Sequence, residues 1–121
     1  MAKRILAIDD DKGLLSLLQF NLEAEGYEIQ TLADPMRTEE YIDKFKPDLM
    51  IIDILMPGRS GFNILDDFKR EGKYQGIPKI FLTCLDDDIE KMVARGCGVE
   101  NYITKPFKPA ELLKVIKNIL G

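Results

Sequence analysis

The chain has 121 residues, and 45% of them are hydrophobic, which is the size and composition of one folded domain. Its formal net charge of -4 argues against a general binder of nucleic acid or of anionic membranes. No apolar stretch approaches the ~20 residues that span a membrane, and the run after the basic N-terminus is too short for a signal peptide. We therefore expect a cytoplasmic protein.

Cysteine and histidine content narrows the chemistry. Cys84 and Cys97 do not form a C-x-x-C pair, and we expect both to be reduced and to act as small apolar side chains. The chain has no histidine, which excludes a Ser-His-Asp triad, a histidine general base and a phosphohistidine carrier. Any chemistry must use carboxylates, hydroxyls, lysine or metal ions.

Strand-like and helix-like patterns alternate along the first half of the chain. The apolar run 5–8 predicts a buried strand and leads into three aspartates, 9–11. Leucines at helical spacing follow, and Gly26 is a plausible helix end. Residues 27–32 alternate as in a half-buried strand, and 36–45 have the pattern of a second helix.

The same alternation continues from the middle of the chain. The apolar run 49–52 predicts a third strand that ends at Asp53. A Pro57-Gly58 turn follows, and then apolar residues at helical spacing predict a third helix. The run 80–82 predicts a fourth strand, which ends at Thr83.

The last part of the chain completes five strand-then-helix repeats. Aspartates 86–88 are best explained as a cap of a fourth helix that continues to Cys97, because acidic side chains favour a helix N-terminus. Residues 102–104 predict a fifth strand that ends at Lys105-Pro106. Pro109 is predicted to begin the fifth helix.

The polarity of the strands predicts their order. The first, third and fourth runs are continuously apolar, as in central parallel strands, whereas the second and fifth are more polar or shorter and fit the edges. Right-handed crossovers then give one five-stranded parallel sheet of order 2-1-3-4-5 with five helices on both faces, a doubly wound α/β fold of the flavodoxin-like class. The polar residues at the strand ends should meet at one edge, where ligands bind in such sheets.

These motifs, in this order, resemble the receiver domain of two-component response regulators, over the whole chain 1–121. The chain is similar to stand-alone chemotaxis-type regulators. Asp9-Asp10 matches the acidic pair of the family, and Asp53-Ile54-Leu55-Met56-Pro57 followed by Gly61 matches the stretch around its phosphorylated aspartate. Thr83 stands at the switch hydroxyl, Tyr102 at the switch aromatic, and Lys105-Pro106 at the Lys-Pro pair; Pro57, Gly61 and Pro106 are assigned as turn residues.

The resemblance implies a phosphorylation switch rather than an enzyme that acts on other substrates. A sensor histidine kinase or phosphotransfer protein would donate a phosphoryl group to Asp53 in a Mg²⁺-dependent reaction, and the domain would hydrolyse its own acyl phosphate slowly. Asp10, Asp53 and the Leu55 carbonyl would bind Mg²⁺ directly, with Asp9 acting through water. Mg²⁺ prefers such hard oxygen ligands and keeps several waters.

The resemblance also implies how the signal leaves the site. Lys105 and Thr83 would bind phosphoryl oxygens, and Tyr102 would rotate as Thr83 moves inward. The face of the fourth helix, fifth strand and fifth helix would then change its binding of an output partner or of a second copy. Cys84 departs from the family pattern, which usually has a smaller residue there, and its thiol is expected to slow phosphate entry and loss.

Other interpretations explain less of the sequence. A phosphatase of the haloacid dehalogenase type would use Asp9 as its nucleophile, but Lys12-Gly13 stands where it needs a threonine, and Asp53 would have no role. A pseudo-receiver that is never phosphorylated typically lacks an acidic residue or the lysine, and this chain keeps them all. A flavodoxin would need a phosphate-cradling loop where this chain has acids. Among the aspartates, Asp11 is the best candidate for a simple helix cap.

Overall fold

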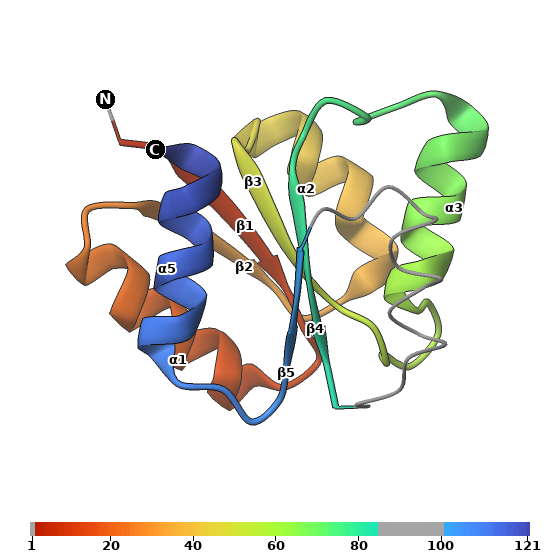
Figure 1. The fold of residues 1–121 in the computed structure, drawn as a ribbon. Coiled ribbons are helices and arrows are strands. Elements are labelled where there is room, and N and C mark those ends of the chain that lie inside the picture. Colours follow the sequence, from red (N-terminus) through yellow and green to blue (C-terminus); the bar gives the residue numbers. More distant parts are fainter. Residues whose placement is uncertain (1, 85–100) are drawn as a thin grey trace.

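The computed structural model describes residues 2–84 and 101–121, which form a three-layer α/β fold with helices on both faces of one sheet (Figure 1). The predicted fourth helix and its expected aspartate cap fall in residues 85–100 and lie outside the described residues. The elements, in chain order, are β1 (Arg4–Ile8), α1 (Lys12–Ala24), β2 (Glu28–Leu32), the short 3-10 helix η1 (Pro35–Arg37), α2 (Thr38–Phe45), β3 (Leu49–Asp53), α3 (Gly61–Glu71), β4 (Lys79–Thr83), β5 (Asn101–Thr104) and α5 (Pro109–Leu120).

The sheet has five parallel strands in the order β2-β1-β3-β4-β5, which confirms the predicted topology. Every residue of β3 and β4 is buried, as their apolar sequences predicted for central strands. The edge strand β2 is only partly buried, and its alternating sequence indicated this. β1 pairs with β2 on one side and β3 on the other, so that Ile8 lies beside Leu32 and Ile52.

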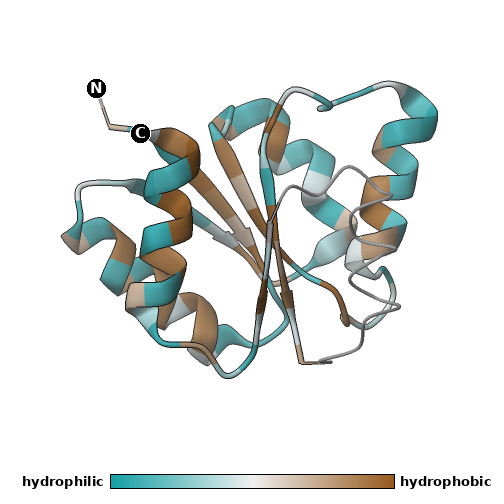
Figure 2. Cartoon of the chain, viewed as in Figure 1, coloured by the Kyte–Doolittle hydropathy of each residue, from teal (hydrophilic) through white to brown (hydrophobic). Residues whose placement is uncertain are grey.

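Two apolar layers hold the helices to the sheet, because successive strand residues point to opposite faces. On one face, Ile5 and Ala7 of β1 pack with residues of α1 and α5. On the other face, Leu6 and Ile8 pack with residues of α2 and α3. Figure 2 shows the consequence: the strands are largely hydrophobic, whereas the helices have hydrophobic and hydrophilic stripes.

Local hydrogen bonds set where the helices begin. The Asp11 side chain accepts a hydrogen bond from the Leu14 N–H, so Asp11 caps α1 as predicted. Ser60 and Asn63 form a reciprocal capping box at the start of α3. The segment predicted as the second helix has two parts, because Asp34 caps the 3-10 turn η1 and α2 begins only at Thr38.

None of the helices described within 2–84 and 101–121 combines the length and the apolar character needed to cross a membrane.

Candidate functional site

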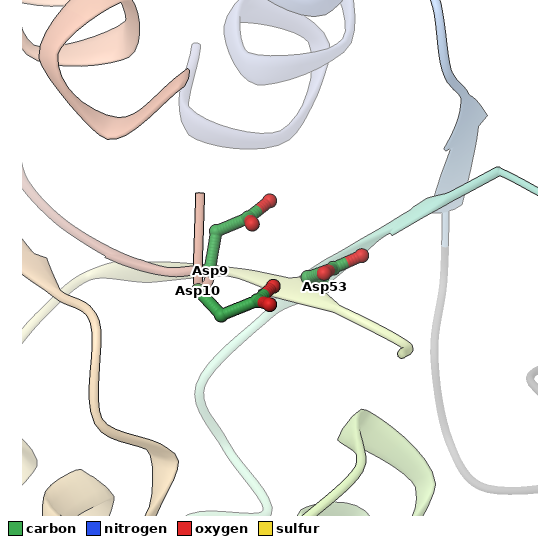
Figure 3. A group of neighbouring side chains, drawn as sticks. All are labelled: Asp9, Asp10 and Asp53. Carbon is green, nitrogen blue, oxygen red and sulfur yellow. The ribbon is translucent and has the colours of Figure 1, made fainter. Parts of the chain in front are cut away.

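Three carboxylates lie together at the carboxyl edge of the sheet. Asp9 and Asp10 follow β1, Asp53 ends β3, and one oxygen from each of the three lies within 4.8 Å of the others (Figure 3). Asp9 and Asp53 are 1% and 4% exposed, whereas Asp10 is exposed. The structure thus brings together the three aspartates that the sequence predicted to converge.

Lys105 lies across the buried pair of aspartates. Its Nζ donates a hydrogen bond to Asp9 Oδ2 at 2.7 Å and lies 3.4 Å from Asp53 Oδ1. The lysine follows β5, and its backbone N–H donates to the Thr83 carbonyl at the end of β4, at 2.6 Å. Pro106 follows through a cis peptide bond. The loop after β5 therefore delivers one positive charge to two buried negative ones.

Burial and charge shift the ionisation of Asp53. Loss of solvent raises the pKa of Asp53 from 3.8 to about 6, and the Asp9 charge adds to this rise while Lys105 opposes it. Burial alone would lower the pKa of Lys105, but its contacts with Asp9 and Asp53 raise it overall. The site is therefore a carboxylate cluster that Lys105 neutralises only in part.

The other two predicted switch residues lie on β4 and β5. Thr83 is the last residue of β4 and is 2% exposed. It stands one position beyond Leu82, the β4 residue that pairs with Asp53, so Thr83 is at the same edge of the sheet as the carboxylates. Tyr102 pairs with Phe81 and packs, partly buried, against the core on the side of α2 and α3.

The loop between β3 and α3 follows Asp53 directly. Its base is closed by a hydrogen bond of 2.8 Å from the Gly61 N–H to the Ile54 carbonyl. Met56 is buried, whereas Leu55 is 54% exposed and lies two residues after Asp53. Gly58 adopts a φ of 83°, a left-handed conformation that suits glycine in the predicted Pro57-Gly58 turn. Gly61, assigned from the sequence as a turn residue, begins α3.

An ion-pair network in this loop was not predicted from the sequence. Arg59 donates to Glu39 through both terminal nitrogens, at 2.8 and 2.7 Å, and also to Asp67 at 2.9 Å. The hydrogen bonds from Arg59 lower the pKa of both the Glu39 and the Asp67 carboxyl. Arg59 is one arginine between a turn and a helix cap, and no periodic pattern indicated its partners.

The donor set fits a small divalent cation. Three carboxylate groups from two neighbouring strands supply hard oxygen ligands, and their mutual repulsion would be relieved by a cation between them. The exposed Asp10 leaves the cluster open on one side, and Mg²⁺ characteristically keeps water ligands. This acidic cluster could therefore bind a metal ion.

An open groove of about 420 Å³ lies next to Lys105. It is lined by residues of α1 and of the loops after β4 and β5, namely Asp11, Leu14, Leu17, Cys84, Lys105, Pro106 and Phe107. Most of this lining is apolar, and Leu17 is 49% exposed. A partner that inserted there would reach Lys105 from solvent.

Comparison with known proteins agrees with this geometry. The family model of the response regulator receiver domain matches residues 5–117. Among solved structures, the chain is similar to the chemotaxis protein CheY4 of Vibrio cholerae, with 28% identity, a TM-score of 0.91, and coverage of 99% of this chain and 100% of that one. It is also similar to a CheY-like receiver domain protein from Methanospirillum hungatei, with 30% identity, a TM-score of 0.88, and coverage of 98% and 93%.

A third similar structure is the BeF3-activated N-terminal receiver domain of Klebsiella pneumoniae RstA, with 31% identity, a TM-score of 0.89, and coverage of 98% of each chain. Receiver domains of this family interact with histidine kinases, and a similar structure is the receiver domain of a histidine kinase from Syntrophus aciditrophicus. The chain therefore belongs to the response regulator receiver domain family.

Proposed function

We propose that residues 1–121 form one receiver domain that works in the cytoplasm as a phosphorylation-controlled switch, with Asp53 as the phosphoacceptor. The observation that carries this proposal is the position of Asp53, buried at the end of β3 beside two other carboxylates and Lys105. A carboxylate in such a place can act as a nucleophile, as in enzymes that form an aspartyl phosphate.

In the proposed transfer, one bond to phosphorus forms and another breaks. An Asp53 carboxylate oxygen attacks the phosphorus atom of the donor and forms an acyl phosphate. The bond from phosphorus to the donor's leaving group breaks, and the electron pair leaves with the histidine nitrogen of a kinase or with the acetate of acetyl phosphate. A pKa of about 6 leaves Asp53 mostly ionised, and so nucleophilic, at neutral pH.

Mg²⁺ is the proposed cofactor. Asp10, Asp53 and the carbonyl of Leu55 would hold it, and Asp9 would act through a water molecule. When bound, the ion would neutralise charge on the carboxylates and on the incoming phosphoryl oxygens. Asp9 already accepts hydrogen bonds from Lys105 and from the Asp11 N–H, which supports its indirect role.

Lys105 and Thr83 are proposed to bind the phosphoryl oxygens. The lysine ammonium is a compact charge on a flexible chain, so it can leave Asp9 for a dianion on the neighbouring Asp53. Thr83 would move with it, and Tyr102 would repack, which shifts the population between two arrangements of the β5–α5 surface. The part of this output face assigned to the fourth helix lies outside the described residues. An output partner or a second copy would read the change.

The phosphodonor is proposed to be a sensor histidine kinase or a phosphotransfer protein. The open apolar groove supports this, because it leaves room for a protein surface next to Lys105. The net charge of -4 gives no support for direct binding of nucleic acid.

Acetyl phosphate tests the phosphoacceptor directly. We expect intact-mass spectrometry to show one phosphoryl adduct in the presence of Mg²⁺ and none with a chelator. Asp53→Asn should remove the adduct completely. Asp48→Asn is the matched control, because Asp48 lies before the other end of β3, where it accepts a hydrogen bond from the Arg4 N–H, and this variant should be modified like the parent.

Two outcomes would contradict the proposal. An adduct that persists on Asp53→Asn would move the nucleophile to Asp9, as in the phosphatase alternative. Equal modification with and without Mg²⁺ would remove the metal from the reaction.

A Lys105→Arg variant separates chemistry from signalling. We expect this variant to be phosphorylated, because Lys105 is not assigned to the metal. Arginine has a larger planar head and cannot replace a compact charge at a crowded phosphate, so the β5 response should be lost. The measurement is the change in β5 amide NMR shifts when beryllofluoride, a phosphoryl mimic, is added to parent and variant. Equal changes in both would show that Lys105 is not needed for the switch.

A further inference from the structure

The Arg59 clamp, defined here as Arg59 with Glu39, Asp67 and the Pro35 carbonyl, joins three elements to the loop after β3. Arg59 donates to Glu39 of α2, to Asp67 of α3, and to the carbonyl of Pro35 in η1 at 3.1 Å. Its side chain is only 10% exposed, whereas its partners Glu39 and Asp67 are 32% and 29% exposed, so these contacts are partly shielded from solvent. The bidentate pair of the Arg59 guanidinium with the Glu39 carboxylate also holds the two side chains in one geometry.

The clamp acts on the loop that joins β3 to α3. Residues 55–60 run between the closed base at Ile54 and Gly61 and contain the exposed Leu55. Among these residues, Met56 is buried in the core and Ser60 caps α3. Arg59 ties the outer half of the loop to α2, an element from a different part of the chain.

We infer that Arg59 is a positioning residue for the metal site, holding the 55–60 loop so that the Leu55 carbonyl can bind an ion held by Asp10 and Asp53. This inference rests on the proposed Mg²⁺ site. Mg²⁺ requires near-ideal octahedral geometry, so movement of a backbone ligand would weaken the binding of the ion. A side chain that orients a ligand without touching the ion typically changes metal affinity by roughly 10- to 100-fold.

Charge and geometry make opposite predictions for Arg59. Its positive charge lies on the loop that follows Asp53, so through charge alone it would weaken the binding of a cation. Replacing it with a neutral residue would then tighten Mg²⁺ binding. If Arg59 acts by positioning the loop, the same replacement weakens binding despite the more favourable charge. The sign of the change therefore separates the two effects.

Isothermal titration calorimetry with MgCl2 measures whether the Kd for Mg²⁺ rises or falls. We expect Arg59→Met to raise the Kd for Mg²⁺ by roughly tenfold. Arg59→Lys keeps the charge but loses the two-pronged geometry, and it should also raise the Kd. Arg37→Met is the charge-matched control, because Arg37 pairs with Glu40 on the exposed surface of α2, and its Kd should be unchanged or slightly lower.

The titrations are made at a temperature where circular dichroism shows every variant fully folded. Loss of global stability alone then leaves the Kd unchanged, because only the folded state is titrated. If Arg59→Met does not fold, the Kd of Arg59→Lys decides: a higher Kd than in the parent supports the positioning role, and an equal or lower Kd contradicts it.

The outcomes distinguish this inference from the proposed function. A parent protein that binds no Mg²⁺ would overturn both the proposed metal role and the inference. A parent that binds Mg²⁺, and loses it in Asp53→Asn, together with Arg59 variants of equal or lower Kd, would overturn the positioning role alone. Weaker binding in both Arg59 variants, with the control unchanged, supports it.

Discussion

Replacing Gly61 with alanine is expected to lower the free energy of unfolding by about 3 kcal/mol, at the upper end of the cost of overpacking a core. A Cβ at this position would lie 2.6 Å from the Asp53 carbonyl oxygen, and 3.2 Å from Ile52 Cγ2 and from Ile54 Cα. These atoms belong to the buried strand β3 and the residue after it, so they have little room to move. The start of α3 would have to shift away from β3.

Urea denaturation followed by circular dichroism measures this loss, with Gly76→Ala as the matched control. An added Cβ at Gly76 would meet nothing within 4 Å, and its backbone is not left-handed, so the control should be neutral or slightly stabilising. Equal stability of Gly61→Ala and the parent would mean that α3 does not approach β3 as closely as the structure shows.

The example of Gly61 shows what the sequence could and could not predict. The family-like spacing after Asp53 matched Gly61 to the motif and assigned it to a turn. The structure places it at the first position of α3, where the reason for glycine is close backbone approach rather than a positive φ. That reason depends on how α3 packs on β3, which is a tertiary contact.

The fold was predictable because burial sets the residue pattern of each strand. Continuous apolar runs identified β1, β3 and β4 as central, and the greater polarity of β2 identified an edge. Convergence of Asp9, Asp10 and Asp53 then followed, since parallel strands place their carboxyl ends at one edge. Topology alone therefore assembles the acidic cluster.

Pairings between distant side chains were not predictable in the same way. Lys105 bonds Asp9 more closely than Asp53, across 96 positions of sequence. Arg59 reaches Glu39 across 20 positions. Neither partner is indicated by periodicity or composition, because such contacts depend on the exact paths of loops. Of the two, the contacts of Lys105 act on the cluster directly, because they oppose the rise in the pKa of Asp53.

Asp53→Asn is expected to stabilise the metal-free protein at pH 7 by about 1–2 kcal/mol. A rise of the Asp53 pKa from 3.8 to about 6 means that the folded state resists ionising this carboxyl. The shift corresponds to at most about 3 kcal/mol, and we discount it because the cluster is open to water on the side of Asp10. Asparagine has nearly the same shape and carries no charge.

The difference in stability between Asp53→Asn and the parent is expected to depend on pH. Below about pH 4, Asp53 is protonated in the folded and unfolded states, and parent and variant should be similarly stable. As the pH rises from about 4 through about 6, the unfolded state releases the proton first, so the contribution of Asp53 to stability is lost. The gap between variant and parent should therefore open across this range and stay constant above it.

Thermal melts in chelator at several pH values measure the gap, and Asp67→Asn is the control of opposite sign. Arg59 and Arg70 lower the pKa of Asp67, so its contribution is present at neutral pH and lost as the pH falls. Asp67→Asn should accordingly be less stable than the parent at pH 7, with a gap that closes on acidification. A lower melting temperature for Asp53→Asn than for the parent at pH 7 would mean that Lys105 compensates the charge of Asp53 fully. The charge of the buried Asp53 carboxylate would then not destabilise the fold, and a cation or a phosphoryl group would have no such cost to remove.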